Sequence, residues 1–122
     1  MTQGGYLPNR EPADQLYQRL MEIHNQAFEA GRFELGYHVL AAALHAAEEL
    51  NDADLLTEVG ELAQHRQKKI DAIQPEHRLS SNSAHRRGNP SQYNALVTIA
   101  AAAKGRIAAD HALERSQRAR GR

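Results

Sequence analysis

The stretch from Gln26 to Asn51 constrains the fold most, because its apolar residues recur at helical spacing on both sides of one glycine. After Gly31, steps of four, three, four and three residues join the positions Phe33, Tyr37, Leu40, Leu44 and Ala47. This spacing places them on one side of a helix. Gly31 suits the left-handed position that ends a helix, and Gly36 with the alanines that follow leaves room for a close neighbour. The stretch therefore predicts a tightly packed helical hairpin.

Start and stop signals divide the remaining sequence into further helices. Asp52 is a favourable N-cap for a helix that starts at Ala53, and Pro75 ends that helix. Asn89 and Pro90 form the predicted start of the last helix, because proline suits the first helical position. No stretch alternates between apolar and polar residues for long, as a half-buried strand would.

These signals predict an all-α fold. The first three helices should form an antiparallel array, because short connections join them. A long fourth helix should follow a flexible linker. The expected helices cover about residues 12–30, 33–50, 53–73 and 90–114.

The same signals give the expected domain organisation. Residues 1–10 are expected to be a disordered tail, and residues 11–75 the three-helix array. Residues 76–89 are polar and basic and are expected to be a flexible linker. Residues 90–122 hold the last helix and a basic tail, which belongs to the same domain or is exchanged between chains.

Two details of the predicted core follow from the apolar stripes. In the first helix, two adjacent stripes predict a face broad enough to touch two neighbours. One stripe holds Leu16, Leu20, Ile23, Ala27 and Ala30, and the other holds Tyr17, Met21, His24 and Phe28. In the third helix, Arg66 stands where the stripe requires an apolar residue, so we expect the far end of this helix to leave the core.

Composition narrows the class of protein. With 122 residues the chain has the size of one domain, and 41% hydrophobic and 25% charged residues are ordinary for a soluble chain. The absence of cysteine excludes disulfides and thiolate zinc sites. The sequence has no apolar run of membrane-spanning length and no signal-peptide pattern at its start. We expect a cytoplasmic protein without membrane contact.

A net charge of zero conceals a strong division along the chain. Residues 1–63 hold 3 Lys or Arg and 11 Asp or Glu, a formal balance of −8, whereas residues 64–122 hold 12 and 4, a balance of +8. The halves can pair with each other, within one chain or between chains, or the basic half can bind a polyanion. Pairing of the two halves with each other is the simpler interpretation.

The hairpin also resembles a known repeat. Residues 17–50 carry large and small residues at characteristic positions: Leu20, Ile23, Ala27, Gly31, Phe33, Gly36, Leu40 and Ala43. In this pattern the stretch resembles one tetratricopeptide repeat. The resemblance implies a protein-interaction module with a partner in a concave groove.

We therefore expect a protein-interaction or self-association module, a homo-oligomer or the binder of a protein partner, that is not an enzyme and needs no cofactor. Its serines and nearby histidines lie in the predicted linker, where no rigid scaffold would hold a nucleophile against its base. No phosphate-binding glycine loop occurs. The residues expected to make the interaction contacts are Tyr37, Leu40, Leu44, Tyr93 and Val97.

Non-specific nucleic-acid binding is the first alternative. Its cations would be Lys68, Lys69, Arg78, Arg86, Arg87, Lys104 and Arg106. These could neutralise phosphates, and their binding would weaken steeply with salt. With 5% aromatic residues, the chain offers little for base stacking.

A metal-binding helical bundle is the second alternative. His38 and His45 lie seven residues apart on one side of the second helix, and Glu49 follows one turn after His45. Imidazole and carboxylate ligands suit transition metals. A metal site needs ligands from several elements, however, so surface histidines are the simpler interpretation and no metal is expected.

Overall fold

The computed structural model describes residues 10–121, and within this range it holds five helices and no strand. The all-α prediction is confirmed. The helices are α1 (Arg10–Glu29), α2 (Phe33–Glu49), α3 (Ala53–Ile73), α4 (Ser81–Arg86) and α5 (Gln92–Arg120). The predicted disordered tail lies outside the described residues, except for Arg10, which begins α1.

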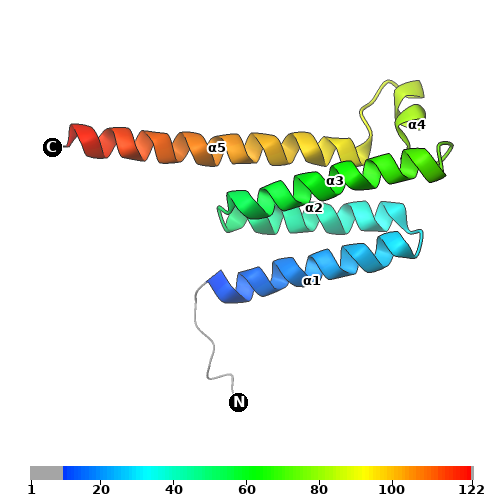
Figure 1. Ribbon diagram of the computed structural model, residues 1–122, viewed down its shortest axis with the longest axis horizontal. Coiled ribbons are helices and arrows are strands. Elements are labelled where there is room, and N and C mark those ends of the chain that lie inside the picture. Colours follow the sequence, from blue (N-terminus) through cyan, green and yellow to red (C-terminus); the bar gives the residue numbers. More distant parts are fainter. Residues whose placement is uncertain (1–9, 122) are drawn as a thin grey trace, which may run out of the picture.

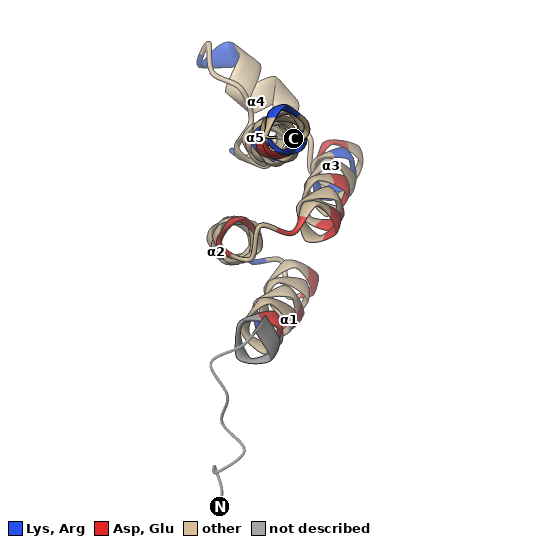
Figure 2. Cartoon of the chain, turned by 90° about the vertical axis from the view of Figure 1, so that its left-hand side faces the viewer, with Lys and Arg blue, Asp and Glu red and all other residues tan. Residues whose placement is uncertain are grey.

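The four long helices lie side by side and form two antiparallel pairs, α1 with α2 and α3 with α5 (Figure 1). The helix α2 also contacts α3 and α5 and so joins the pairs. Seen end-on, the helices follow a zigzag from α1 to α5 (Figure 2). The predicted array of the first three helices is present. The last helix packs on α3 of the same chain, one of the two arrangements that the sequence left open.

Three helices end at a residue with a left-handed backbone. Gly31 ends α1 with φ of 79°, Asn51 ends α2 with φ of 56°, and Gly88 follows α4 with φ of 75°. At each of these ends, the amides of the left-handed residue and of the residue after it donate back to carbonyls of the last turn, which satisfies groups that a helix end leaves unpaired. The Asp52 carboxylate then accepts the first free amides of α3, as predicted. Local sequence thus fixes the corners of the array.

Small residues let the helices approach closely at the centre of the core. Five alanines of α2, α3 and α5 are almost fully buried: Ala43, Ala47, Ala63, Ala100 and Ala103. At the α3–α5 contact, a Cβ added to Gly60 would lie 3.4 Å from the Cβ of Ala100. Large residues fill the space between these contacts, and Tyr17, Leu40, Leu56 and Tyr93 are fully buried. The close packing predicted for the alanine-rich helices is present.

One of the two predicted stripes of α1 is largely outside the core. Tyr17, His24 and Phe28 are buried, whereas Leu16 is 57% exposed and Ile23 is 47% exposed. The predicted face does touch two neighbours, α2 and α3, but it packs closely only on α2, because α1 lies at the edge of the zigzag. It reaches α3 through long side chains, as when the Tyr17 hydroxyl donates a 2.6 Å hydrogen bond to Glu58.

The expected linker at residues 76–89 is instead folded against α3. It contains α4, and Leu79 is 1% exposed. The Gln67 side-chain amide donates to the Leu79 carbonyl at 3.1 Å, and the Asp71 carboxylate accepts from both the amide and the hydroxyl of Ser81. Sequence periodicity missed this segment because α3 satisfies its polar groups and Leu79 is its single large apolar anchor.

The helix α5 starts later and ends later than predicted. Ser91 is its N-cap, with a side chain that accepts from the Asn94 amide, rather than Asn89. Its buried stripe is Tyr93, Leu96, Ala100, Ala103 and Ile107. From Ala108 to Arg120 every residue of the helix is exposed. The last turns therefore extend beyond the array (Figure 1). The helix continues past the predicted end near residue 114, because the alanines of these turns favour the helical state.

Candidate functional site

The residues predicted to contact a partner pack the chain's own helices together. Leu40, Leu44 and Tyr93 are at most 1% exposed. Tyr37 and Val97 are half-buried and pack against the same core. The Tyr93 hydroxyl donates a 2.8 Å hydrogen bond to the Phe33 carbonyl, which ties α5 to the start of α2. These residues therefore leave little surface open to a partner.

The exposed half of α5 is the largest element that the array leaves uncovered. One side of it carries Asp110, Leu113, Gln117 and Arg120, which follow one another at steps of three, four and three residues. Such steps keep side chains on one face of a helix. Leu113 is 53% exposed. The face thus has an acid at its first end, a base at its last end and an apolar side chain between them.

A shallow acidic hollow lies where α5 leaves the array. It has a volume of about 270 Å³, and its lining includes Glu48, Asn51, Ile107 and Asp110. Arg106 also lines it, with Nη2 2.9 Å from the Glu48 carboxylate. Asp and Glu side chains gather on α1, α2 and α3, whereas α4 and the end of α5 carry many of the basic ones (Figure 2). The base of the projecting helix therefore borders an acidic surface.

Ion pairs within the chain engage several cations of the nucleic-acid alternative. Arg78 pairs with Glu34 at 3.0 Å, and Arg106 pairs with Glu48, so both bridges join the acidic half to the basic half. Within the basic half, Arg86 contacts a carboxylate at 3.3 Å and Arg87 donates to the Arg78 carbonyl. These contacts support the simpler reading of the charge division, in which the halves pair with each other.

The remaining cations of that set are dispersed over the molecule. Lys68 and Lys69 lie near the end of α3, and Lys104 lies on α5. The predicted cations therefore belong to three separate regions, namely the α4 segment, the end of α3 and the middle of α5.

The histidines of the metal alternative lie on the outer side of α2. His38 and His45 are exposed, and Nδ1 of His45 is 3.1 Å from the carboxylate of Glu48 rather than Glu49. Within residues 10–121, no group of three His, Asp or Glu side chains is arranged to hold a metal ion. Among the same residues, no helix has the length and apolar character that crossing a membrane requires.

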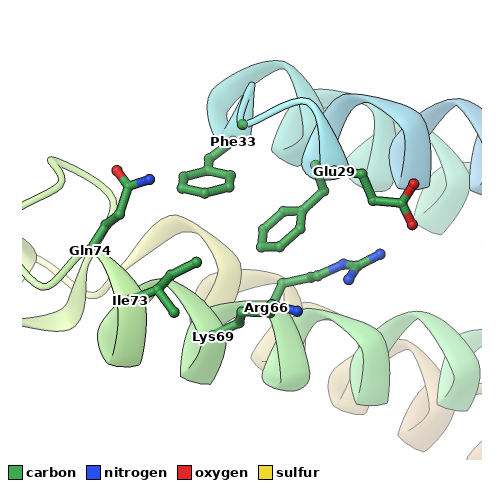
Figure 3. Close-up of a pocket in the computed structure, with 8 residues that line it drawn as sticks. Glu29, Phe33, Arg66, Lys69, Ile73 and Gln74 are labelled. Carbon is green, nitrogen blue, oxygen red and sulfur yellow. The ribbon is translucent and has the colours of Figure 1, made fainter.

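A second hollow lies at the opposite end of the array, between the α1–α2 corner and the last turns of α3. This cleft has a volume of about 370 Å³. Its walls combine aromatic, apolar and charged side chains: Phe28, Glu29, Phe33, Arg66, Lys69 and Ile73. Figure 3 shows Phe33 and Ile73 toward one end, with Arg66 and Glu29 toward the other. We call this feature the corner cleft.

Buried hydrogen bonds hold one wall of the corner cleft. His24 is fully buried, with Nδ1 2.7 Å from the Gly36 carbonyl and Nε2 3.1 Å from Nε of Arg66. The carbonyl can only accept and the guanidinium can only donate, so His24 is neutral with its proton on Nδ1. Nη2 of Arg66 donates to the Asn25 side chain at 2.6 Å. Burial lowers the pKa of His24 from its ordinary 6.5, and the charge of Arg66 lowers it further.

The prediction for Arg66 was wrong in its consequence. Its side chain interrupts the apolar stripe, but α3 stays in the core, because Arg66 is 9% exposed and Ile70 is fully buried. The guanidinium carbon lies 4.3 Å from the centre of the Phe28 ring, and His24 accepts from its Nε. The sequence shows both residues as polar interruptions of an apolar stripe, His24 in the first helix and Arg66 in the third. Their pairing depends on how the two helices pack.

No protein-family model, curated protein or solved structure matches this chain. The likeness of residues 17–50 to a tetratricopeptide repeat therefore remains a prediction from the hairpin pattern.

Proposed function

We propose that the protein is a small association module that acts without catalysis and binds a second copy of itself through the projecting half of α5. The observation that carries the proposal is the complete exposure of α5 after Ile107, although the helix continues to Arg120. Isolated helices of about 12–15 residues are marginal in water. A partner that covers this segment would supply the tertiary contacts that its own array does not.

The order of charges on the exposed face favours an antiparallel pair. Asp110 and Arg120 stand at opposite ends of the face, with Leu113 and Gln117 between them. In an antiparallel pair each Asp110 meets the Arg120 of the other copy, and the two contacts are equivalent by the two-fold axis. In a parallel pair, like charges would lie side by side and repel each other.

The surroundings of α5 are compatible with this pair. The small side chains of Ala109, Ala112 and Ser116 flank Leu113 and permit close approach. Each Arg120 would lie beside the acidic hollow of the other copy, whose lining includes Glu48 and Asp110. Both contacts join the basic end of one chain to an acidic region of the other. The apolar area is small, so the association is expected to be weak and sensitive to salt.

Solution mass at two ionic strengths tests the proposal directly. At high micromolar concentration, light scattering should give a dimer at about 0.05 M salt and mainly monomer at about 0.5 M salt, where charges are screened within about 4 Å. A monomer under both conditions would contradict the proposal.

Charge reversal tests the contact and its direction together. Asp110→Arg and Arg120→Asp should each abolish the dimer, whereas an equimolar mixture of the two variants, or one chain with both changes, should restore it. The chain with both changes reports the direction, because in a parallel pair it would again place like charges side by side, whereas the mixture would pair opposite charges in either direction. Arg86→Asp, an exposed arginine on α4 at the other end of the array, is the matched control and should leave the dimer intact.

A further inference from the structure

We propose that the corner cleft is a binding site for a monocarboxylate attached to a flat apolar body. This inference goes beyond self-association, because the cleft lies at the α1–α2 corner and the projecting half of α5 lies at the opposite end of the array (Figure 1).

The first reason is that Arg66 is a buried cation without a carboxylate partner. Its side chain lies against the Phe28 ring, and its two hydrogen bonds go to neutral acceptors on His24 and Asn25. Among the described residues, no Asp or Glu oxygen lies within 4.0 Å of its guanidinium. The ion pairs formed within that distance all involve other cations. Buried charges in proteins are usually paired, so Arg66 lacks the contacting anion that a buried cation usually has.

The second reason is the shape and polarity of the cleft. The ring centroids of Phe28 and Phe33 are 4.6 Å apart, and Ile73 continues this apolar surface at one end of the cleft (Figure 3). Arg66 and Lys69 supply two cations. A volume of about 370 Å³ falls at the small end of known ligand pockets. It fits a carboxylate near Arg66 with an aromatic or branched apolar group against Phe33 and Ile73.

The third reason limits the charge of the ligand. Glu29 lines the cleft and is exposed, and its negative charge opposes the lowering of the Arg66 pKa by burial. Two cations and one carboxylate leave a single positive charge. A monoanion matches this balance, whereas Glu29 would repel a phosphate dianion more strongly than a monocarboxylate. Arg66 also presents the planar donors that carboxylates accept best.

Titration with 3-phenylpropionate, followed by NMR of backbone amides, tests the site. The acid should shift the amides of Gly31, Phe33, Lys69 and Gln74 in a saturable manner, and its uncharged amide should bind at least about tenfold more weakly. Inorganic phosphate should shift them less than the acid at equal concentration. Equal binding of acid and amide, or no saturable shift, would overturn the proposal.

Variants at the rim separate the site from the fold. Lys69→Gln, at an exposed side chain, should weaken binding of the acid several-fold, and Glu29→Gln should strengthen it by a similar factor. Glu22→Gln, another exposed acid on α1 outside the cleft, should change nothing. If Glu29→Gln weakened binding, or if all three variants behaved alike, the charge argument would be refuted. Unchanged thermal unfolding of each variant shows that the fold is intact.

The carboxylate can come from a free small molecule or from the end of a peptide chain. A short peptide ending in phenylalanine with a free carboxylate distinguishes these sources when compared with 3-phenylpropionate. Tighter binding of the peptide would assign the site to chain ends, and tighter binding of the small acid would assign it to free carboxylates. Failure of both would refute the site without bearing on the α5 dimer, which is measured by mass.

Discussion

His24 is the residue whose chemistry depends most on the fold. It is buried and neutral between the Gly36 carbonyl and Arg66, and burial lowers its pKa below 6.5. In the unfolded chain it takes up a proton as the pH falls below about 6.5, whereas in the folded chain it resists protonation to a lower pH. At such pH values the unfolded state binds more protons than the folded state. The free energy of unfolding therefore decreases as the pH is lowered.

We therefore expect the melting temperature to fall as the pH is lowered from about 8 to about 5.5, and His24→Gln to reduce this dependence, because glutamine does not titrate. Circular dichroism at a series of pH values measures both effects. His111→Gln, at an exposed position of α5, is the control and should retain the dependence of the parent protein. The same pH dependence in His24→Gln as in the parent would show that His24 is not its source.

Two glycines give opposite predictions for the same substitution. A Cβ on Gly36 would lie 3.0 Å from the Tyr93 hydroxyl and 3.4 Å from Nδ1 of His24, whereas a Cβ on Gly105 would meet nothing within 4 Å. Gly36→Ala should destabilise the protein by about 1–3 kcal/mol, because it overpacks a buried contact. Gly105→Ala should stabilise it by about 0.5–1 kcal/mol through helix propensity. Urea denaturation measures both, and a gain in stability from Gly36→Ala would contradict the close approach.

At the scale of the element, α4 is held by its neighbours rather than by its own periodicity. Leu79 is buried before its start, and Ser80 caps it by accepting from the Ser83 amide. Leu79→Ala should cost about 2–5 kcal/mol, because it leaves a cavity between this segment and α3. Leu16→Ala, at a side chain that is 57% exposed, should change stability by no more than about 0.5 kcal/mol. Equal costs would mean that the α4 segment is not part of the folded core.

At the scale of the whole molecule, salt should separate folding from association. The bridges Glu34–Arg78 and Glu48–Arg106 are surface ion pairs, which typically contribute about 0–1 kcal/mol each. The core is mainly apolar, so raising the salt from about 0.05 M to about 0.5 M should leave the melting temperature of the monomer almost unchanged. The same change should dissociate the dimer. Calorimetry of dilute protein measures the melting temperature, and light scattering measures the dimer. Loss of the fold over the same range of salt as loss of the dimer would contradict this prediction.

Local sequence alone determined the α-helical class, the corners of the array and the placement of its first three helices. Gly31, Asn51 and Asp52 impose their turns through backbone conformation and nearby hydrogen bonds, and helical spacing identifies the apolar faces. These are short-range effects, so they are visible in a window of a few residues. The projecting end of α5 was missed because alanine propensity continues the helix where the apolar anchors stop.

Only the tertiary structure decided which apolar stripe of α1 is buried, how residues 76–89 fold, and which polar residues meet. His24 and Arg66 are 42 residues apart in sequence, and Gln67 reaches the Leu79 carbonyl across a turn. Such contacts depend on which helices become neighbours, and the free energy of a buried polar group depends on whether a partner is present. A single sequence gives the chemical groups and their local spacing, whereas the packing of distant helices brings the groups of the corner cleft together.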